Sequence, residues 1–194
     1  MSLYPFHALL GRMKYITRWA LMRCMRQESL SEHTADTALL AHALCLIARN
    51  ITHTGAGIRP DTVAAAALYH DAPEILTGDM PTPIKYDNPA IRKAYKEVEA
   101  VAEEKLLHML PEEFQPVYAP ILTVTDPETE RLVKAADKLS AYIKCLEEVK
   151  AGNSEFRDAA AQTRAALEEY ELPEVAYFLE TFMPSFSLTL DQLK

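Results

Sequence analysis

The feature that most constrains the fold is a series of long apolar stretches with helical spacing, several of them opened by a helix-start signal. Ser29 and Glu32 have the spacing of a capping box. Asn88-Pro89 and Asp126-Pro127 place proline in the first turn of a helix, where it is tolerated. The chain has only five glycines, which is few for an all-β protein. We therefore predict an all-α fold, with residues 1–194 in a single helical domain.

The spacing of the apolar residues predicts the extent of each helix. The helix that follows Ser29 is expected to be long and buried along a stripe that includes Leu39 and Leu44. Pro73 should end or bend the helix that begins at Pro60, ahead of a rigid loop over residues 77–83. The other helices are expected at residues 4–16, 88–110, 126–152, 156–170 and 174–181, with a turn or extended link at residues 17–19.

Composition narrows the partners and the compartment. The formal net charge of −8 argues against a polymeric nucleic-acid partner, because such proteins neutralise phosphates with a basic face. Cys24, Cys45 and Cys145 have no CxxC spacing and sit among apolar residues, so we expect buried thiols in a reducing compartment. The sequence shows neither a signal peptide nor an apolar run of membrane-spanning length. We therefore expect a cytoplasmic protein with no membrane partner.

The dipeptide His70-Asp71 closes an alanine-rich apolar run, with His33 well upstream and Asp137 well downstream. Aspartate is costly inside such a run unless it is paired or binds a cation. Two imidazoles and two carboxylates are a complete ligand set for one divalent ion. The expected helices could deliver these ligands to one point, so a metal-dependent hydrolase is the leading hypothesis.

Each candidate ligand also has an ordinary structural explanation. His33 alone is more typical of a capping or core histidine. His70-Asp71 can be polar decoration at a helix end, and Asp137 can form a surface salt bridge with Lys134 or Lys138. These alternatives stay open at the level of the sequence.

Three further residues fit phosphate chemistry. Glu74 shares a helical face with His70 and Asp71 if the helix continues for one more turn, and could hydrogen-bond a reacting water or donate a proton. The Arg18 guanidinium could bind phosphate with two parallel hydrogen bonds. The adjacent Trp19 offers a flat apolar wall for a sugar or a base.

The order of His33, His70-Asp71 and Asp137 resembles that of the HD-domain metal-dependent phosphohydrolases. Further stretches are similar to the bacterial 5′-deoxynucleotidase family along essentially the whole chain. They are Arg18-Trp19, Ser31-Glu32-His33, Tyr69-His70-Asp71-Ala72, Glu74, residues 76–83 and residues 182–186.

The resemblance implies a single HD-domain helical bundle and a reaction. Deoxyribonucleoside 5′-monophosphates would be hydrolysed to deoxyribonucleosides and phosphate by a metal-activated water. His33, His70, Asp71 and Asp137 would hold one divalent ion. Cobalt or manganese is expected first, with iron and zinc as alternatives.

The resemblance also assigns roles around the ion. Arg18, Asp71 and Glu74 would be catalytic, with Arg18 orienting the phosphate. The expected substrate contacts are Arg18, Trp19, His33, Asp71, Asp79, Met80, Pro81, Thr82 and Asp137. Packing of Trp19 and the loop against the sugar would favour deoxyribose over ribose. The resemblance also implies a homodimer. Pro73 departs from the small polar residue expected there and could shift Glu74.

Two other functions compete with this one. Another HD enzyme would act on a nucleoside triphosphate, a cyclic nucleotide or guanosine tetraphosphate. A catalytically inactive HD module would bind a nucleotide as a sensor. The intact set of ligands, together with Arg18 and Glu74, favours an enzyme.

Overall fold

The computed structural model describes residues 3–85 and 88–194, apart from the side chains of residues 82 and 83. Within these ranges the regular secondary structure is helical, and the strand-like pairing is limited to an isolated antiparallel bridge between Thr17 and Ser29. The prediction of an all-α fold is therefore confirmed, and so is the link at residues 17–19. That residues 1–194 form a single domain stays a prediction.

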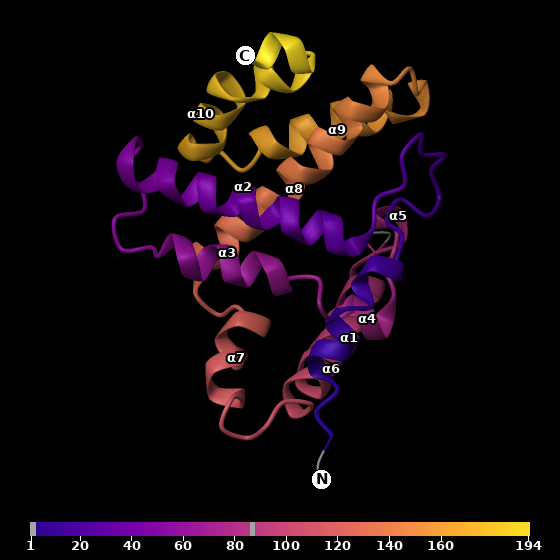
Figure 1. The fold of residues 1–194 in the computed structure, drawn as a ribbon, viewed down its shortest axis with the longest axis vertical. Helices are drawn as coiled ribbons and strands as arrows, with labels where there is room; N and C mark the ends of the chain where they lie inside the picture. Colours follow the sequence, from indigo (N-terminus) through magenta and orange to yellow (C-terminus); the bar gives the residue numbers. More distant parts are fainter. Residues whose placement is uncertain (1–2, 86–87) are drawn as a thin grey trace.

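Three helices cross near the middle of the molecule and build the main core (Figure 1). They are α2 (Leu30–Asn50), α3 (Pro60–Tyr69) and α8 (Pro127–Lys150). Both signals of the capping box are present at the start of α2, and Asp126 caps α8 by accepting from the Thr129 amide. The fully buried core side chains include Leu44, Val63, Leu132 and Leu139. Each such side chain contributes about 1.5–3 kcal/mol by leaving water.

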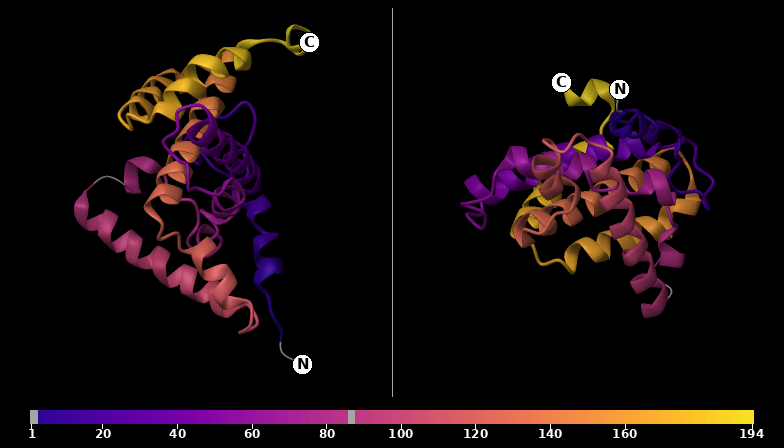
Figure 2. Two further views of the ribbon diagram at one scale, coloured as in Figure 1. Left: turned by 90° about the vertical axis from the view of Figure 1, so that its left-hand side faces the viewer. Right: turned by 90° about the horizontal axis from the view of Figure 1, so that it is seen from below.

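Helices α9 (Arg157–Glu168) and α10 (Pro173–Thr181) pack at one end of this core, against α8 and α2 respectively. At the other end lie α6 (Pro89–His108) and α7 (Gln115–Leu122), as Figures 1 and 2 show from two directions. The remaining elements are short: α1 (Phe6–Leu10), α4 (Glu74–Thr77), α5 (Thr82–Lys85) and the 3₁₀ helices η1 (Met13–Tyr15), η2 (Ser154–Phe156), η3 (Met183–Ser187) and η4 (Leu190–Leu193).

A second apolar cluster joins α1, α6 and α7 to the turn that follows α3. Its buried members are Phe6, Ala72, Leu106, Leu110 and Leu122. Because Ala72 directly follows His70-Asp71, this cluster anchors the turn that carries the dipeptide.

The structure corrects several expected helices. The helix expected at residues 4–16 is broken at Gly11 into α1 and η1, because glycine weakens a helix interior. Helices α5 and α7 occupy segments where no helix was predicted. Both are proline-containing segments, and in α7 prolines stand at the start and inside the helix.

The buried stripe predicted for α2 is partly wrong. Leu39 is 72% exposed, whereas Leu40 and Leu44 point into the core. Apolar residues surround much of this helix, so their spacing alone does not single out the buried face.

The three cysteines are free thiols, and Cys45 and Cys145 are buried as expected while Cys24 is only partly so. None of the helices in the described ranges combines the length and the apolar character needed to cross a membrane.

Candidate functional site: a metal centre beside a cavity

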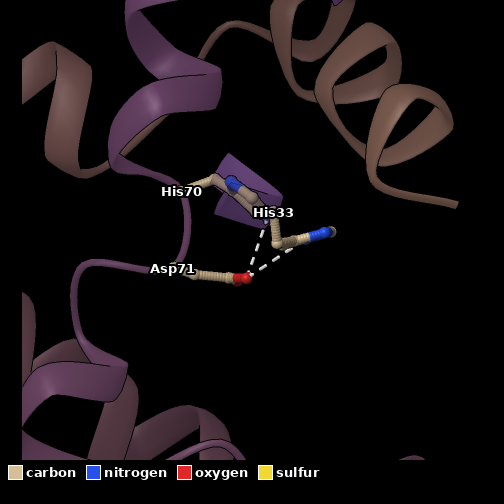
Figure 3. A group of neighbouring side chains, drawn as sticks. All are labelled: His33, His70 and Asp71. Atoms are coloured by element: carbon tan, nitrogen blue, oxygen red, sulfur yellow. Dashed lines mark ion pairs between the residues drawn. The ribbon is translucent and has the colours of Figure 1, made fainter. Parts of the chain in front are cut away.

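Three potential metal ligands meet where the start of α2 faces the end of α3. His33 lies in the first turn of α2, His70 caps the C-terminus of α3, and Asp71 lies in the turn that follows. One ligand atom from each residue lies within 4.8 Å of the others. Asp71 Oδ2 is 3.1 Å from His70 Nε2 and 3.5 Å from His33 Nε2, and Figure 3 shows both contacts.

The second ring nitrogen of each histidine faces a group that orients the ring. His70 Nδ1 is 2.7 Å from the Ala67 carbonyl oxygen, an acceptor, so Nδ1 carries a proton. His33 Nδ1 is 3.2 Å from the hydroxyl of Ser140, which is buried on α8. Partners of this kind orient the histidines of metal sites and leave Nε2 for the ion.

The surroundings of His70 Nε2 indicate a cation site. It is buried and finds no hydrogen-bond partner among the described residues, because its 3.1 Å contact with Asp71 lacks hydrogen-bond geometry. Adjacent ligand atoms that each lie about 2.1 Å from one ion are separated by about 3.0 Å in an octahedral site and about 3.4 Å in a tetrahedral one. The spacing between His70 and Asp71 therefore suits two ligands of the same ion.

Asp137 joins this group from α8. Its Oδ1 is 3.1 Å from His33 Nε2. The surface salt bridge with Lys134 does not form, since Lys134 pairs with Glu130 one turn earlier. The structure thus brings all four sequence-predicted ligands into one contact network, with His33 between the two carboxylates.

The electrostatics of the group favour positive charge at its centre. Burial disfavours a charge on Asp71, but His70 and His33 outweigh it and lower the pKa of this carboxyl group. Burial also opposes a charge on His70, yet Asp71 and Asp137 raise the pKa of the imidazole to about 9. Two ionised carboxylates around two imidazoles create a potential that attracts a cation.

Arg18 and Trp19 lie next to this group. Arg18 Nη1 donates to Asp71 Oδ2 over 3.2 Å, and Arg18 Nε is 3.4 Å from Glu28. The indole of Trp19 donates to Glu28 over 2.9 Å and lies 5.3 Å, between ring centroids, from Phe156. Trp19 has a φ of 60°, a left-handed conformation that is strained for a bulky residue.

Glu74 begins the short helix α4 rather than extending α3. Pro73 precedes it as the N-cap of α4, so the predicted break at Pro73 is confirmed and the shared face on a continued α3 is wrong. The Glu74 side chain is nevertheless buried, and its Oε2 has no hydrogen-bond partner in the described residues. Burial, with Asp71 and Asp79 nearby, raises the pKa of Glu74 to about 9, so the carboxyl group is neutral at pH 7.

A cavity of about 650 Å³ adjoins the group. Asp137 belongs to the group and lines the cavity, and so does Arg18, which donates to Asp71. Among the predicted substrate contacts, Trp19, Asp79 and Pro81 also line it, whereas Met80 is not part of the lining. Thr82 begins α5, and its side chain lies outside the described part of the structure.

Sequence reasoning missed the opposite wall of this cavity. It is built from residues of α8, η2 and α9, which are Lys138, Ala141, Glu155, Asp158, Ala159, Gln162 and Thr163. It also missed Ser140. The available signal was helical spacing, since Ser140 and Ala141 follow Asp137 by three and four residues and share its face of α8.

Comparison with known proteins gives consistent results. A protein-family model described as 5′-deoxynucleotidase YfbR-like matches residues 5–186. A 5′-deoxynucleotidase of Vibrio parahaemolyticus is 50% identical over 190 residues, which is 97% of each chain. The 5′-deoxynucleotidase YfbR of Escherichia coli is 47% identical over 190 residues, 97% of this chain and 94% of its own.

Two solved structures share the fold. An HD-domain phosphohydrolase from Listeria innocua has a TM-score of 0.80 at 24% identity and covers 93% of this chain and 87% of its own. The cyanophage S-2L HD phosphohydrolase, bound to dA and one catalytic Zn²⁺ ion, has a TM-score of 0.67 at 20% identity, covering 92% and 96%. The predicted HD-domain fold is thereby confirmed, and the chain belongs to the YfbR-like 5′-deoxynucleotidase family.

Proposed function

We propose that the chain hydrolyses deoxyribonucleoside 5′-monophosphates to deoxyribonucleosides and phosphate. Membership of the family supports this reaction, because relatives about half identical over nearly their whole length are 5′-deoxynucleotidases. The observation that carries the proposal is the group of His33, which is buried, with the partly buried His70 and Asp71. Arg18 and Asp137 contact this group and also line a cavity of nucleotide size.

In this proposal His33, His70, Asp71 and Asp137 hold one divalent ion. The unpartnered His70 Nε2 and the two ionised carboxylates support it. Such an ion neutralises phosphate charge and lowers the pKa of a coordinated water. The mixed nitrogen and oxygen donors suit manganese, cobalt, iron or zinc. We propose cobalt or manganese first, on the family resemblance, with iron and zinc as alternatives. The cyanophage relative of this fold binds zinc.

The protein side chains then orient the substrate and move protons. Arg18 is held close to the centre by Asp71 and Glu28, where its guanidinium can bind the phosphate oxygens. Asp71 accepts from Arg18 while facing both imidazoles, so it aligns the phosphate-binding group with the metal ligands. Glu74, neutral at pH 7, can donate a proton to the leaving 5′-oxygen.

The sugar is proposed to lie against Trp19 and the loop that contains Asp79, Met80, Pro81 and Thr82. Trp19, Asp79 and Pro81 line the cavity on the side of Arg18. An extra 2′-hydroxyl buried there without a partner would cost roughly 1–3 kcal/mol. We therefore expect a preference for deoxyribose and little selection among bases.

We propose that the chain forms a homodimer in the cytoplasm, with neither a nucleic-acid polymer nor a membrane as partner. Large apolar side chains stay exposed on α2 and after α10, including Leu39, Phe182 and Leu190. Three free cysteines suit a reducing compartment. Light scattering on the purified chain tests the dimer, and a monomer at micromolar concentration would contradict it.

The reaction is tested by phosphate release from metal-stripped protein, re-supplied with cobalt, manganese, iron or zinc one at a time. Deoxyribonucleoside monophosphates, ribonucleoside monophosphates and a triphosphate are compared. We expect metal-dependent release that is fastest from the deoxyribonucleoside monophosphates. Release mainly from the triphosphate would indicate another HD hydrolase, and binding of metal without any release would indicate a sensor.

Two variants test the assigned roles. Asp137→Ala should lose both metal and turnover, and unchanged turnover would remove Asp137 from the ligand set. Arg18→Ala should slow hydrolysis and keep its metal, since Arg18 is placed on the phosphate. Loss of metal from the Arg18 variant would contradict that role.

A further inference from the structure

The loop over residues 19–28 leads from Trp19 to the start of α2 and forms one side of the cavity. Most of its side chains are exposed, with Leu21 at 68% and Met25 at 69%, so an apolar core does not hold it. Its two ends are joined by the Arg18 amide, which donates to the Glu28 carbonyl over 3.0 Å. The conformation of the loop between these ends must come from other contacts.

Several of those contacts converge on Glu148 near the end of α8, a side chain that is 2% exposed. Exposed bonds from Arg23 to Glu155 and from Arg26 to Glu32 add to them. Its Oε2 accepts from the Met25 amide over 2.8 Å and from Asn153 Nδ2 over 2.9 Å. Its Oε1 accepts from the Arg26 amide over 3.1 Å and from Lys144 Nζ. The four acceptor sites of the carboxylate are thus filled, two of them by the backbone of the loop.

Lys144 and Asn153 each make a second bond to the same loop. Lys144 Nζ donates to the Arg26 carbonyl over 2.6 Å, and Asn153 Nδ2 donates to the Arg23 carbonyl over 2.6 Å. Both the amide and the carbonyl of Arg26 are therefore fixed to α8. We call Lys144, Glu148 and Asn153 the loop anchor.

The charge state of the anchor suits this task. Burial works against a charge on Glu148, but the hydrogen bonds from Lys144, Asn153 and the two loop amides outweigh it and lower the pKa to about 2. A buried ion pair adds little stability by itself, whereas a fully bonded one selects a single conformation.

The anchored loop begins at Trp19 and ends at Glu28, which binds the Trp19 indole. Glu28, two residues after Arg26, accepts from the indole of Trp19 and faces Arg18. Phe156, three residues after Asn153, contacts the indole ring. The strained backbone of Trp19 persists only where such surroundings determine it.

We propose that Glu148, with Lys144 and Asn153, is a positioning residue that fixes the loop over residues 19–28 and so sets Trp19 against the substrate cavity. The consequence for substrate rests on the proposed function, whereas the consequence for the loop does not. Glu148 lies outside the lining of the cavity, so it acts through Glu28 and Trp19 rather than on the substrate.

The test uses the fluorescence of Trp19, which is the only tryptophan in the chain. Glu148→Gln replaces one carboxylate oxygen by an NH₂ group, which is itself a donor. It then faces donors from the loop and from Lys144 or Asn153, so two of the hydrogen bonds of Glu148 are lost. We expect red-shifted emission and stronger quenching by acrylamide. For a deoxyribonucleoside monophosphate we expect a fall in kcat/KM on the order of 10-fold, mainly through KM, with metal affinity unchanged.

Two further variants make the result specific. Asn153→Asp removes the donor to Arg23 and Glu148 but keeps the Oδ1 that accepts from the Glu155 amide, so it tests the anchor if Glu148→Gln does not fold. Glu174→Gln is the matched control, because Glu174 is equally buried and bonded to Arg131 of α8 far along the helix. It should lower stability and leave Trp19 emission and KM unchanged.

Folded anchor variants with wild-type emission and KM would overturn the proposal, and so would the same changes in Glu174→Gln. If the wild-type protein releases no phosphate, the proposed function fails by itself. The emission of Trp19 then still decides whether the anchor positions the loop.

Discussion

Replacing Ser140 by alanine should weaken metal binding without touching a ligand. Ser140 Oγ is 3.2 Å from His33 Nδ1, and both side chains are buried. The hydroxyl orients the imidazole so that Nε2 faces Asp71 and Asp137. In Ser140→Ala the Nδ1 group loses this partner in a site that water does not reach, since His33 is 0% exposed.

The magnitude follows from two costs. A buried polar group left without a partner costs about 1–3 kcal/mol, which for a chain of 194 residues lowers Tm by about 2–4 °C per kcal/mol. Loss of the group that orients a ligating histidine lowers metal affinity by about 10- to 100-fold. A tenfold change corresponds to about 1.4 kcal/mol, so the two costs are similar in size.

The assay is a titration of metal-stripped protein with manganese, followed by thermal unfolding of the same samples. Thr37→Val is the matched control, because the Thr37 hydroxyl is buried and lies 3.5 Å from the other nitrogen of His33. That nitrogen is assigned to the ion, so loss of the Thr37 hydroxyl should leave metal affinity nearly unchanged. Wild-type affinity in Ser140→Ala, or equal losses in both variants, would refute the reasoning.

Three other predictions concern the core, the loop anchor and the proton donor. Leu44→Ala should lower the free energy of unfolding by about 2–5 kcal/mol and Leu39→Ala by less than about 0.5 kcal/mol, because only Leu44 is buried. Urea titrations measure both values, and similar losses in the two variants would contradict the packing. The free energy of unfolding of the wild type should exceed that of Glu148→Gln by its full amount above pH 4.5, and the difference should vanish toward pH 2, because folding lowers the pKa of Glu148 to about 2. Urea titrations that find the difference independent of pH would contradict this. Glu74→Gln should keep its metal and lose on the order of 100-fold or more in kcat, because the neutral amide cannot give up a proton; wild-type phosphate release would remove Glu74 from the mechanism.

The main helices could be predicted because their start signals are local. The capping box at Ser29 and the proline after Asp126 act within one turn, and the structure begins α2 and α8 at these positions. The buried face of α2 could not be predicted in the same way. Leu39 and Leu40 are equally apolar, and only the positions of α3 and α8 decide which of them is covered.

The residues of the candidate site also differ in how far local sequence could predict them. His70 and Asp71 are adjacent in sequence, and aspartate beside an alanine-rich run is unusual enough to indicate a role. Ser140 and Gln162 are not unusual in this way, because a serine or glutamine within a helix is ordinary, and the spacing of Ser140 from Asp137 indicates a shared helix face but no role. Their place beside His33 and the cavity depends on how α8 and α9 pack, which is a property of the tertiary structure.

The end of α3 explains how His70 and Asp71, although adjacent, face the same point, as the proposed metal site requires. Neighbouring residues within a helix point about 100° apart, so His70 and Asp71 could not converge if α3 continued through them. Pro73 removes an amide that a longer helix would need and instead starts α4, while Ala72 is fixed in the apolar cluster of α1, α6 and α7. The turn is thus held on both sides. The proline that departs from the expected family pattern therefore supports the geometry of His70 and Asp71, and it leaves Glu74 buried at the start of the next helix.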